Sequence, residues 1–146
     1  MKNIFAHQLG KLRTEQQLSQ NDIASQLFVS RQAVSKWENG DRNISLKIAD
    51  ELSILYNVPL AYIFNLTNKY DKDIRIKPVD YNILISNLLN LKKKNNLSYR
   101  EIATSIGVSS SNCYKYFNNK LVIPVHILID LSLYFKVDVD ELCFKL

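Results

Sequence analysis

The chain has 146 residues, a length that indicates one domain of about 150 residues. Hydrophobic residues make up 47% and charged residues 23%, and with three glycines and three prolines the collagen-like and linker-like classes are excluded. No apolar run approaches the roughly 18 residues of a membrane helix, and the polar N-terminus lacks a signal-peptide core. We therefore expect a cytoplasmic protein with no membrane partner. The net charge of +5 favours a nucleic-acid partner.

The first half of the chain carries the start signals of several short helices. Phe5, Leu9 and Leu12 share one face of a first helix. Serines that can accept hydrogen bonds from the free N–H groups of a helix start come next. These are Ser19, followed three residues later by Asp22, then Ser30, and Ser45 before an apolar face at Ile48, Leu52, Leu55 and Tyr56. A short helix at Pro59–Phe64 completes this half.

Residues 66–79 have mixed charge and no helical periodicity, so we expect a linker there. The second half then repeats the pattern, with Ser98 and Glu101 as a capping box and Ser109 as the next N-cap. Pro124 suits the first position of a later helix, and a short helix at Val139–Phe144 ends the half. No convincing strand pattern occurs. The expected class is all-α, with about five helices in each half.

The two halves align without a gap when the chain is shifted by 79 positions, with 15 identities within positions 8–64. Most identities are apolar or helix-start residues, so the repeat preserves a core and its caps, and the chain is two domains of about 65 residues. In each half two N-cap serines stand 11 residues apart. That spacing allows a two-turn helix, a tight turn and a second helix, with Ala24 or Ala103 where they meet. It predicts a helix-turn-helix, whose second helix enters a DNA major groove.

Residues 18–40, LSQNDIASQLFVSRQAVSKWENG, resemble the Cro/C1-type (XRE) helix-turn-helix family of bacterial and phage repressors, and the likeness extends over residues 4–64. Residues 97–119, LSYREIATSIGVSSSNCYKYFNN, resemble it more loosely. The resemblance implies two tandem lambda-repressor-like domains, residues 1–65 and 80–146. It also implies a transcription regulator that binds double-stranded DNA sequence-specifically, for which we expect repression and, as in many members, a homodimer.

The resemblance implies roles for residues of the first copy. The recognition helix begins near Arg31, and Arg and Gln can each bind a base through two hydrogen bonds. The residues expected to face the groove are Arg31, Gln32, Ser35 and Lys36. Those expected at or near phosphates are Gln20, Asn39, Arg42 and Asn43, with Ser30 at the helix start. An ion pair of Arg13 and Glu38 ties the first helix to the recognition helix, and Trp37 belongs to the core.

The second copy keeps the helix-start residues but loses most of the base-contacting set. Its candidates for DNA contact are Ser110, Ser111, Asn112, Tyr114 and Lys115. Three interpretations stay open: it reads another half-site, it binds the DNA backbone, or it is an interface with a protein partner through residues 80–146. In the last case Tyr114, Tyr116 and Phe117 would supply aromatic surface. The run from Lys92 to Lys94 is either a solvated helix end or a phosphate contact.

The two copies also differ at the turn, where the family has Gly. The second copy has Gly107 and the first has Phe28, which costs about 1 kcal/mol if the backbone there is left-handed. The first recognition helix ends at Gly40, and Asn119 takes that place in the second.

Other chemistry is thin. Cys113 and Cys143 align with Val34 and Phe64, so we expect buried thiols without a disulfide. No nucleophile motif, phosphate loop or metal-ligand spacing occurs, and we expect no enzymatic activity, no cofactor and no metal. Two function classes remain, a DNA-binding regulator and a protein-interaction module in which DNA binding is secondary.

Overall fold

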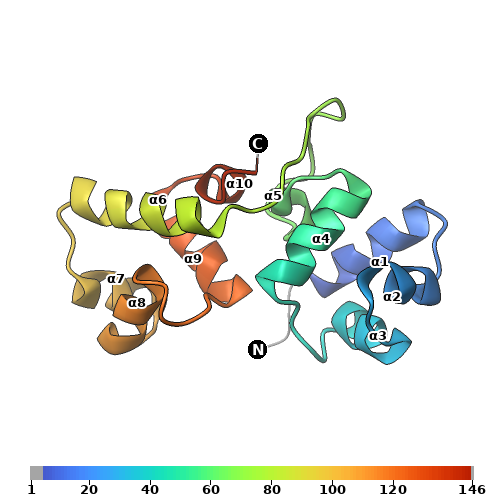
Figure 1. Cartoon of the computed structure of the whole chain (residues 1–146), viewed down its shortest axis with the longest axis horizontal. Helices are drawn as coiled ribbons and strands as arrows, with labels where there is room; N and C mark the ends of the chain where they lie inside the picture. The colour runs from blue at the N-terminus through green and yellow to red at the C-terminus, as the bar shows by residue number, and fades with distance from the viewer. Residues whose placement is uncertain (1–4, 146) are drawn as a thin grey trace. The chain divides into compact units, whose positions relative to one another are not determined.

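The computed structural model describes residues 5–145, and this part of the chain contains ten helices and no strand (Figure 1). It divides between Ile76 and Lys77 into two compact units, called unit 1 and unit 2 below. Unit 1 contains α1 (Ala6–Glu15), α2 (Gln20–Leu27), α3 (Arg31–Asn39), α4 (Leu46–Tyr56) and α5 (Leu60–Ile63). Unit 2 contains α6 (Tyr81–Lys94), α7 (Tyr99–Ile106), α8 (Ser110–Phe117), α9 (Val125–Phe135) and α10 (Val139–Leu142). The predicted all-α class is confirmed. None of the described helices has the length and apolar character needed to cross a bilayer.

Serine side chains begin the helices of both helix-turn-helix pairs, as predicted. The hydroxyl of Ser19 accepts a hydrogen bond from the Asp22 N–H at 3.0 Å, and the Asp22 carboxylate accepts one from the Ser19 N–H at 2.7 Å. Ser98 and Glu101 form the same capping box in unit 2. Each pair satisfies N–H groups that a helix start leaves without partners. The other predicted serine N-caps, also confirmed, are Ser30, Ser45 and Ser109.

Several helix boundaries differ from prediction by one or two residues. The short helices predicted at Pro59–Phe64 and Val139–Phe144 are Leu60–Ile63 and Val139–Leu142. Helix α9 begins at Val125, so Pro124 is its N-cap and not its first residue, because the ψ of Pro124 is an extended 150°. Helix α8 ends at Phe117, two residues before Asn119. Asn119 does adopt the expected left-handed conformation, with φ 56°.

The repeat extends to the way the first and last helices of each unit are joined. The Gln8 side-chain amide donates to the Tyr62 carbonyl at 3.0 Å. At the equivalent position of unit 2, Asn87 donates to the Leu142 carbonyl at 2.9 Å. The apolar faces around these bonds are buried on both sides, with Leu9 5% and Leu88 0% exposed. Because the caps and the core recur together, the chain builds the same five-helix scaffold twice.

The turn inside each helix-turn-helix has a left-handed residue. Gly107 takes φ 72° in unit 2, where glycine meets no Cβ penalty. Phe28 takes φ 57° at the same place in unit 1, and the residue is 94% exposed. The expected backbone strain at Phe28 is therefore present, and no packing of the ring offsets it.

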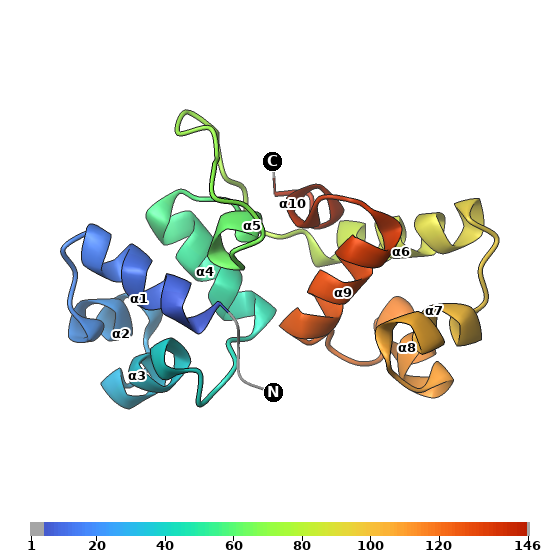
Figure 2. The same ribbon diagram turned by 180° about the vertical axis from the view of Figure 1, so that it is seen from behind.

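The segment after α5 is a long loop that projects beyond the helices (Figures 1 and 2) and makes contacts with unit 1. The rings of Tyr70 and Tyr62 meet edge to face, with centroids 4.7 Å apart. Asn57 donates to the Ile74 carbonyl at 3.3 Å. On the other side of the division, the Lys77 N–H donates to the Lys145 carbonyl at 2.8 Å. Both ends of the region between the domains are therefore held by contacts within a unit.

Candidate nucleic-acid interface

Helix α3 has one buried and one polar face. Its buried face consists of Ala33, Val34 and Trp37, with exposed fractions of 8%, 2% and 6%. The spacing i, i+1, i+4 places these side chains on one side of the helix. The four residues predicted to face a DNA groove lie on the rest of its surface. The exposed residues are Arg31, Gln32 and Lys36, and Ser35 is partly exposed.

A polar cluster joins the start of α2, the end of α1 and the end of α3. The carboxylate of Glu38 accepts hydrogen bonds from Arg13 Nε at 2.6 Å and Nη2 at 3.1 Å, so the predicted ion pair is present. The same carboxylate accepts a third bond from Gln20 Nε2 at 2.9 Å. Arg13 Nη1 also donates to the Leu18 carbonyl at 2.7 Å. This cluster, called the Glu38 cluster below, fixes the recognition helix against the two helices before it.

The Glu38 cluster also reaches the first residue of the recognition helix. Arg31 Nη1 lies 3.4 Å from Gln20 Oε1, so Gln20 accepts from Arg31 while it donates to Glu38. A side-chain amide carries two N–H donors. One donor of Gln20 therefore stays available for a further acceptor.

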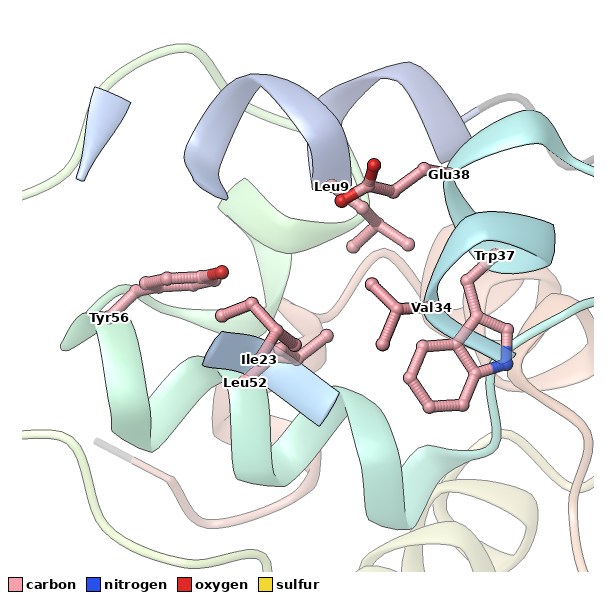
Figure 3. A pocket seen from close by; sticks show the side chains of 7 residues that line it. All are labelled: Leu9, Ile23, Val34, Trp37, Glu38, Leu52 and Tyr56. Carbon is pink, nitrogen blue, oxygen red and sulfur yellow. The ribbon is translucent and has the colours of Figure 1, made fainter. Parts of the chain in front are cut away.

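Burial and charge shift the pKa values of two groups at the cluster. The hydrogen bonds to Glu38 raise the pKa of Arg13. Burial, with a contribution from the negative charge of Glu38, raises the pKa of Tyr56 to about 12. A small pocket of about 10 Å³ adjoins the cluster. It is lined by Leu9, Ile23, Val34, Trp37, Glu38, Leu52 and Tyr56 (Figure 3).

The residues predicted to meet phosphates lie around the ends of these helices. Asn39 is exposed at the end of α3, and its side chain lies 3.5 Å from the Ser35 hydroxyl. Arg42 and Asn43 are exposed in the loop that follows. The hydroxyl of Ser30 is occupied as the α3 cap, accepting from the Ala33 N–H at 3.1 Å.

Unit 2 has aromatic rings where unit 1 has the Glu38 cluster. At the three equivalent positions stand Lys92, Tyr99 and Phe117. Lys92 Nζ lies 4.3 Å from the centre of the Tyr99 ring, and the Tyr99 ring meets Phe117 edge to face at 5.8 Å. Tyr99 also meets Tyr114 edge to face at 5.3 Å, and Lys120 Nζ lies 5.3 Å from the Tyr114 ring centre. These five residues are called the Tyr99 cluster below.

The expected aromatic surface of unit 2 is smaller than predicted. Tyr114 is 42% exposed, but Tyr116 is 7% and Phe117 0% exposed, so the prediction that these two are surface residues is wrong. They share the inner face of α8 with Cys113, at i, i+3 and i+4. The other predicted contact residues, Ser110, Ser111 and Lys115, are exposed, whereas Asn112 is partly covered. Leu121 and Val122, which sequence reasoning did not single out, are 40% and 72% exposed just after α8.

Neither cysteine offers reactive chemistry. Cys113 and Cys143 are both buried, as predicted, and neither takes part in a disulfide. Burial raises the pKa of Cys113 to about 11, which keeps it a neutral thiol. Within residues 5–145 no group of His, Cys, Asp and Glu side chains is placed to hold a metal ion.

Comparison with known proteins matches the helix-turn-helix family model to the chain twice, over residues 9–63 and 88–142. The chain belongs to the Cro/C1-type helix-turn-helix family. The two matches start 79 residues apart, the register in which the halves repeat, so the predicted tandem arrangement is confirmed. The HTH-type transcriptional activator BcrR of Enterococcus faecalis is 53% identical over 36 residues, which span 25% of this chain and 18% of that protein. No solved structure matches the chain. Family and relative together support a DNA-binding transcription regulator.

Proposed function

We propose that unit 1 binds double-stranded DNA sequence-specifically, with α3 in the major groove. One observation carries the proposal. Three of the four predicted groove-facing residues are exposed, and Ser35 is partly exposed, on the side of α3 opposite the face that anchors it in the core. A helix held by a buried face presents the other face in a fixed orientation, which sequence readout requires.

The chemistry of this face suits base edges. Arg31 can donate two hydrogen bonds to O6 and N7 of guanine, and Gln32 can pair with N6 and N7 of adenine. Lys36 stands four residues after Gln32 and so projects from the same face one turn later. Ser35 can donate to or accept from either kind of base. We assign base contacts to these four residues.

Phosphate contacts belong to the residues at the edges of the helices. Gln20 retains one free amide N–H while Glu38 and Arg31 hold the rest of its side chain, so it can donate to a phosphate without leaving the Glu38 cluster. Asn39, Arg42 and Asn43 are exposed at the other end of α3. Ser30 is better suited to a backbone N–H contact, since its hydroxyl caps the helix. Such contacts fix the register of the protein on the duplex but do not discriminate sequence.

We propose repression as the mode of regulation. Occupancy of an operator that overlaps a promoter excludes RNA polymerase, and this needs no contact beyond those with DNA. The relative BcrR is named an activator, but the match covers 36 residues and does not extend to most of that protein. A reporter gene placed behind a DNA sequence that the chain binds distinguishes the two modes of regulation. When the chain is supplied, expression falls if the chain is a repressor and rises if it is an activator.

Protein binding by unit 2 is a second candidate function, favoured by one observation. Apolar surface is exposed by Tyr114 on α8 and by Leu121 and Val122 just after it. Pull-down with the intact chain, compared with a Val122→Asp variant, tests it, because a charge would remove such an interface.

Selection of bound duplexes from a random DNA pool tests the main proposal. The intact chain is compared with a Gln32→Ala variant and with Gln26→Ala, which changes an exposed glutamine on α2. A good bidentate base contact contributes about 1–3 kcal/mol of discrimination. We expect a defined motif that Gln32→Ala relaxes at one position and Gln26→Ala leaves intact. Absence of any motif, or equal effects of the two variants, contradicts the proposal.

A further inference from the structure

The helix-turn-helix of unit 2 is far more cationic than that of unit 1. Residues 92–120 contain six Lys and Arg and one acidic residue. The equivalent residues 13–41 contain three Lys and Arg and four acidic residues. The helix-turn-helix without the base-contacting set therefore carries the larger positive charge, which is the electrostatic footprint of phosphate binding.

Two of the substitutions remove carboxylates beside α8. Glu38 of unit 1 becomes Phe117, and Asp41 becomes Lys120. Arg13 is neutralised by Glu38, whereas Lys92 at the equivalent position lies over the face of Tyr99. Among the described residues, none of the cations within 92–120 is placed at ion-pair distance from a carboxylate, whereas unit 1 has the pairs Lys11–Glu15 and Arg13–Glu38. The cations of the unit 2 helix-turn-helix are therefore not neutralised by a carboxylate there.

The Tyr99 cluster joins these cations into one surface. Lys92 contacts Tyr99, Tyr99 contacts Tyr114, and Tyr114 contacts Lys120. Lys115 is exposed on α8 next to Tyr114 in the chain. The surface therefore spans the end of α6, the start of α7, and α8 with the loop after it.

The hydroxyl of Tyr99 adds a neutral donor to this surface. Its oxygen accepts a hydrogen bond from Asn118 Nδ2 at 3.0 Å. A phenol that accepts through its oxygen keeps its own hydrogen to donate. Tyr99 stands where unit 1 has Gln20, the first residue of the helix, so both units place a donor at the same point of the scaffold.

The same surface lacks the arginine and glutamine that begin the recognition helix of unit 1. Ser110 and Ser111 replace Arg31 and Gln32, and serine contacts different bases without a two-bond match. The ring of Tyr114 replaces Ser35 in the middle of the face. We propose that unit 2 binds the phosphate backbone of duplex DNA through Lys92, Lys115, Lys120 and the Tyr99 hydroxyl, without discriminating sequence. The inference rests on the proposed function in that it places DNA at the same face of both units.

Salt dependence of binding tests this proposal. The intact chain is titrated against a labelled random-sequence duplex of about 30 base pairs, or three helical turns, with salt varied from about 50 to 200 mM. The double variant Lys115→Ala/Lys120→Ala is compared with Lys69→Ala/Lys72→Ala, which removes the same charge from exposed positions in unit 1. Each lost phosphate contact makes the slope of log K against log salt shallower by about 0.9. We expect a change of about 1.8 for the unit 2 variant and a much smaller one for the control.

Two further variants separate phosphate binding from damage to the fold. Lys115→Arg/Lys120→Arg keeps both charges and is expected to retain the wild-type slope. Tyr99→Phe removes only the hydroxyl and is expected to weaken binding several-fold on all sequences alike. Equal slopes for the unit 2 variant and its control overturn the proposal.

The same variants, tested in the duplex selection, distinguish binding of the DNA backbone from recognition of base sequence. If Lys115→Ala/Lys120→Ala or Ser110→Ala/Ser111→Ala alters the selected motif at particular positions, unit 2 reads bases and the proposal is wrong. If the slope is unaffected while Val122→Asp abolishes a protein complex, unit 2 is a protein interface and the proposal is equally wrong. A failed selection with an intact slope effect would remove the function proposed for unit 1 and leave that of unit 2 standing.

Discussion

The two units attach their recognition helices by different interactions, an ionic cluster in unit 1 and aromatic contacts in unit 2. In unit 1 the Glu38 carboxylate accepts three hydrogen bonds from Arg13 and Gln20. In unit 2 the same three positions hold a lysine over a ring and two rings meeting edge to face. The backbone around them is nevertheless the same helix-turn-helix, capped by serines in the same places.

The difference shows which parts of the scaffold are interchangeable. Caps and apolar faces recur because each helix needs them wherever it starts and packs. The junction between α1, α2 and α3 can be ionic or aromatic, provided that its members change together. Removing one partner alone would leave a largely buried charge without compensation, which is costly. The predictions below break one unit at a time, and Trp37, the only tryptophan, reports on unit 1.

The largest effect is expected at Phe117, which is fully buried. Phe117→Ala removes the ring that Tyr99 packs against and leaves a cavity, at a cost of about 3–5 kcal/mol. Hydrogen–deuterium exchange followed peptide by peptide should show faster exchange throughout α6 to α10. The urea transition of Trp37 fluorescence should stay where it is. A shift of that transition by the same amount would mean that the units do not unfold independently.

Glu38→Ala is the corresponding change in unit 1. It leaves the Arg13 guanidinium and the Gln20 amide without their acceptor, and hydrogen bonds to charged groups contribute about 1.5–3 kcal/mol. We expect unit 1 to lose about 2–3 kcal/mol, measured by Trp37 fluorescence in urea. Glu15→Ala is the matched control: its pair with Lys11 is 3.9 Å long and exposed, so the loss should be about 0.3 kcal/mol. Similar losses for both variants would contradict a structural role for the Glu38 cluster.

The sequence predicts those features of this comparison that are local. A serine before an apolar helical face is a local signal of a helix start, and all five predicted serine caps are present. Two of them, Ser19 and Ser98, also have an acid three residues later and form capping boxes. The ion pair of Arg13 and Glu38 came from the family resemblance, which carries tertiary information that spacing alone lacks. The hydrogen bond from Gln20 to Glu38 was not predicted, because a glutamine at a helix start has many possible acceptors.

Features that depend on how helices approach one another were missed. The contact of Asn118 with Tyr99 joins residues 19 positions apart, and nothing local marks it. The burial of Tyr116 and Phe117 is different, because a signal was present. Tyr116 aligns with Trp37, which was assigned to the core, and the i, i+3, i+4 spacing from Cys113 defines one helical face. The prediction of an aromatic surface rested on residue type and neglected the helical periodicity.

The turn offers a substitution that makes the units alike. Phe28→Gly removes a left-handed phenylalanine that is 94% exposed, and should stabilise unit 1 by about 1 kcal/mol. Gly107→Ala is the reciprocal change. A Cβ at Gly107 would meet no atom within 4 Å, so only the backbone cost of about 1 kcal/mol should appear in unit 2. If Phe28→Gly instead destabilises unit 1, the ring makes a contact in solution that offsets its strain.

The smallest effect is expected at alkaline pH, where Tyr56 of unit 1 ionises. Burial and Glu38 raise the pKa of Tyr56 to about 12, whereas the equivalent residue of unit 2 is Phe135, which has no hydroxyl to ionise. A group whose folded pKa is raised adds stability that is complete below its unfolded pKa, about 10 for tyrosine, and is lost as pH rises towards the folded value. Unit 1 should therefore lose stability between about pH 10 and 12, to an extent reduced by the partial exposure of Tyr56. Tyr56→Phe should abolish this part of the pH dependence in the Trp37 transition, and an unchanged profile would mean that the hydroxyl ionises equally well in the folded and unfolded states.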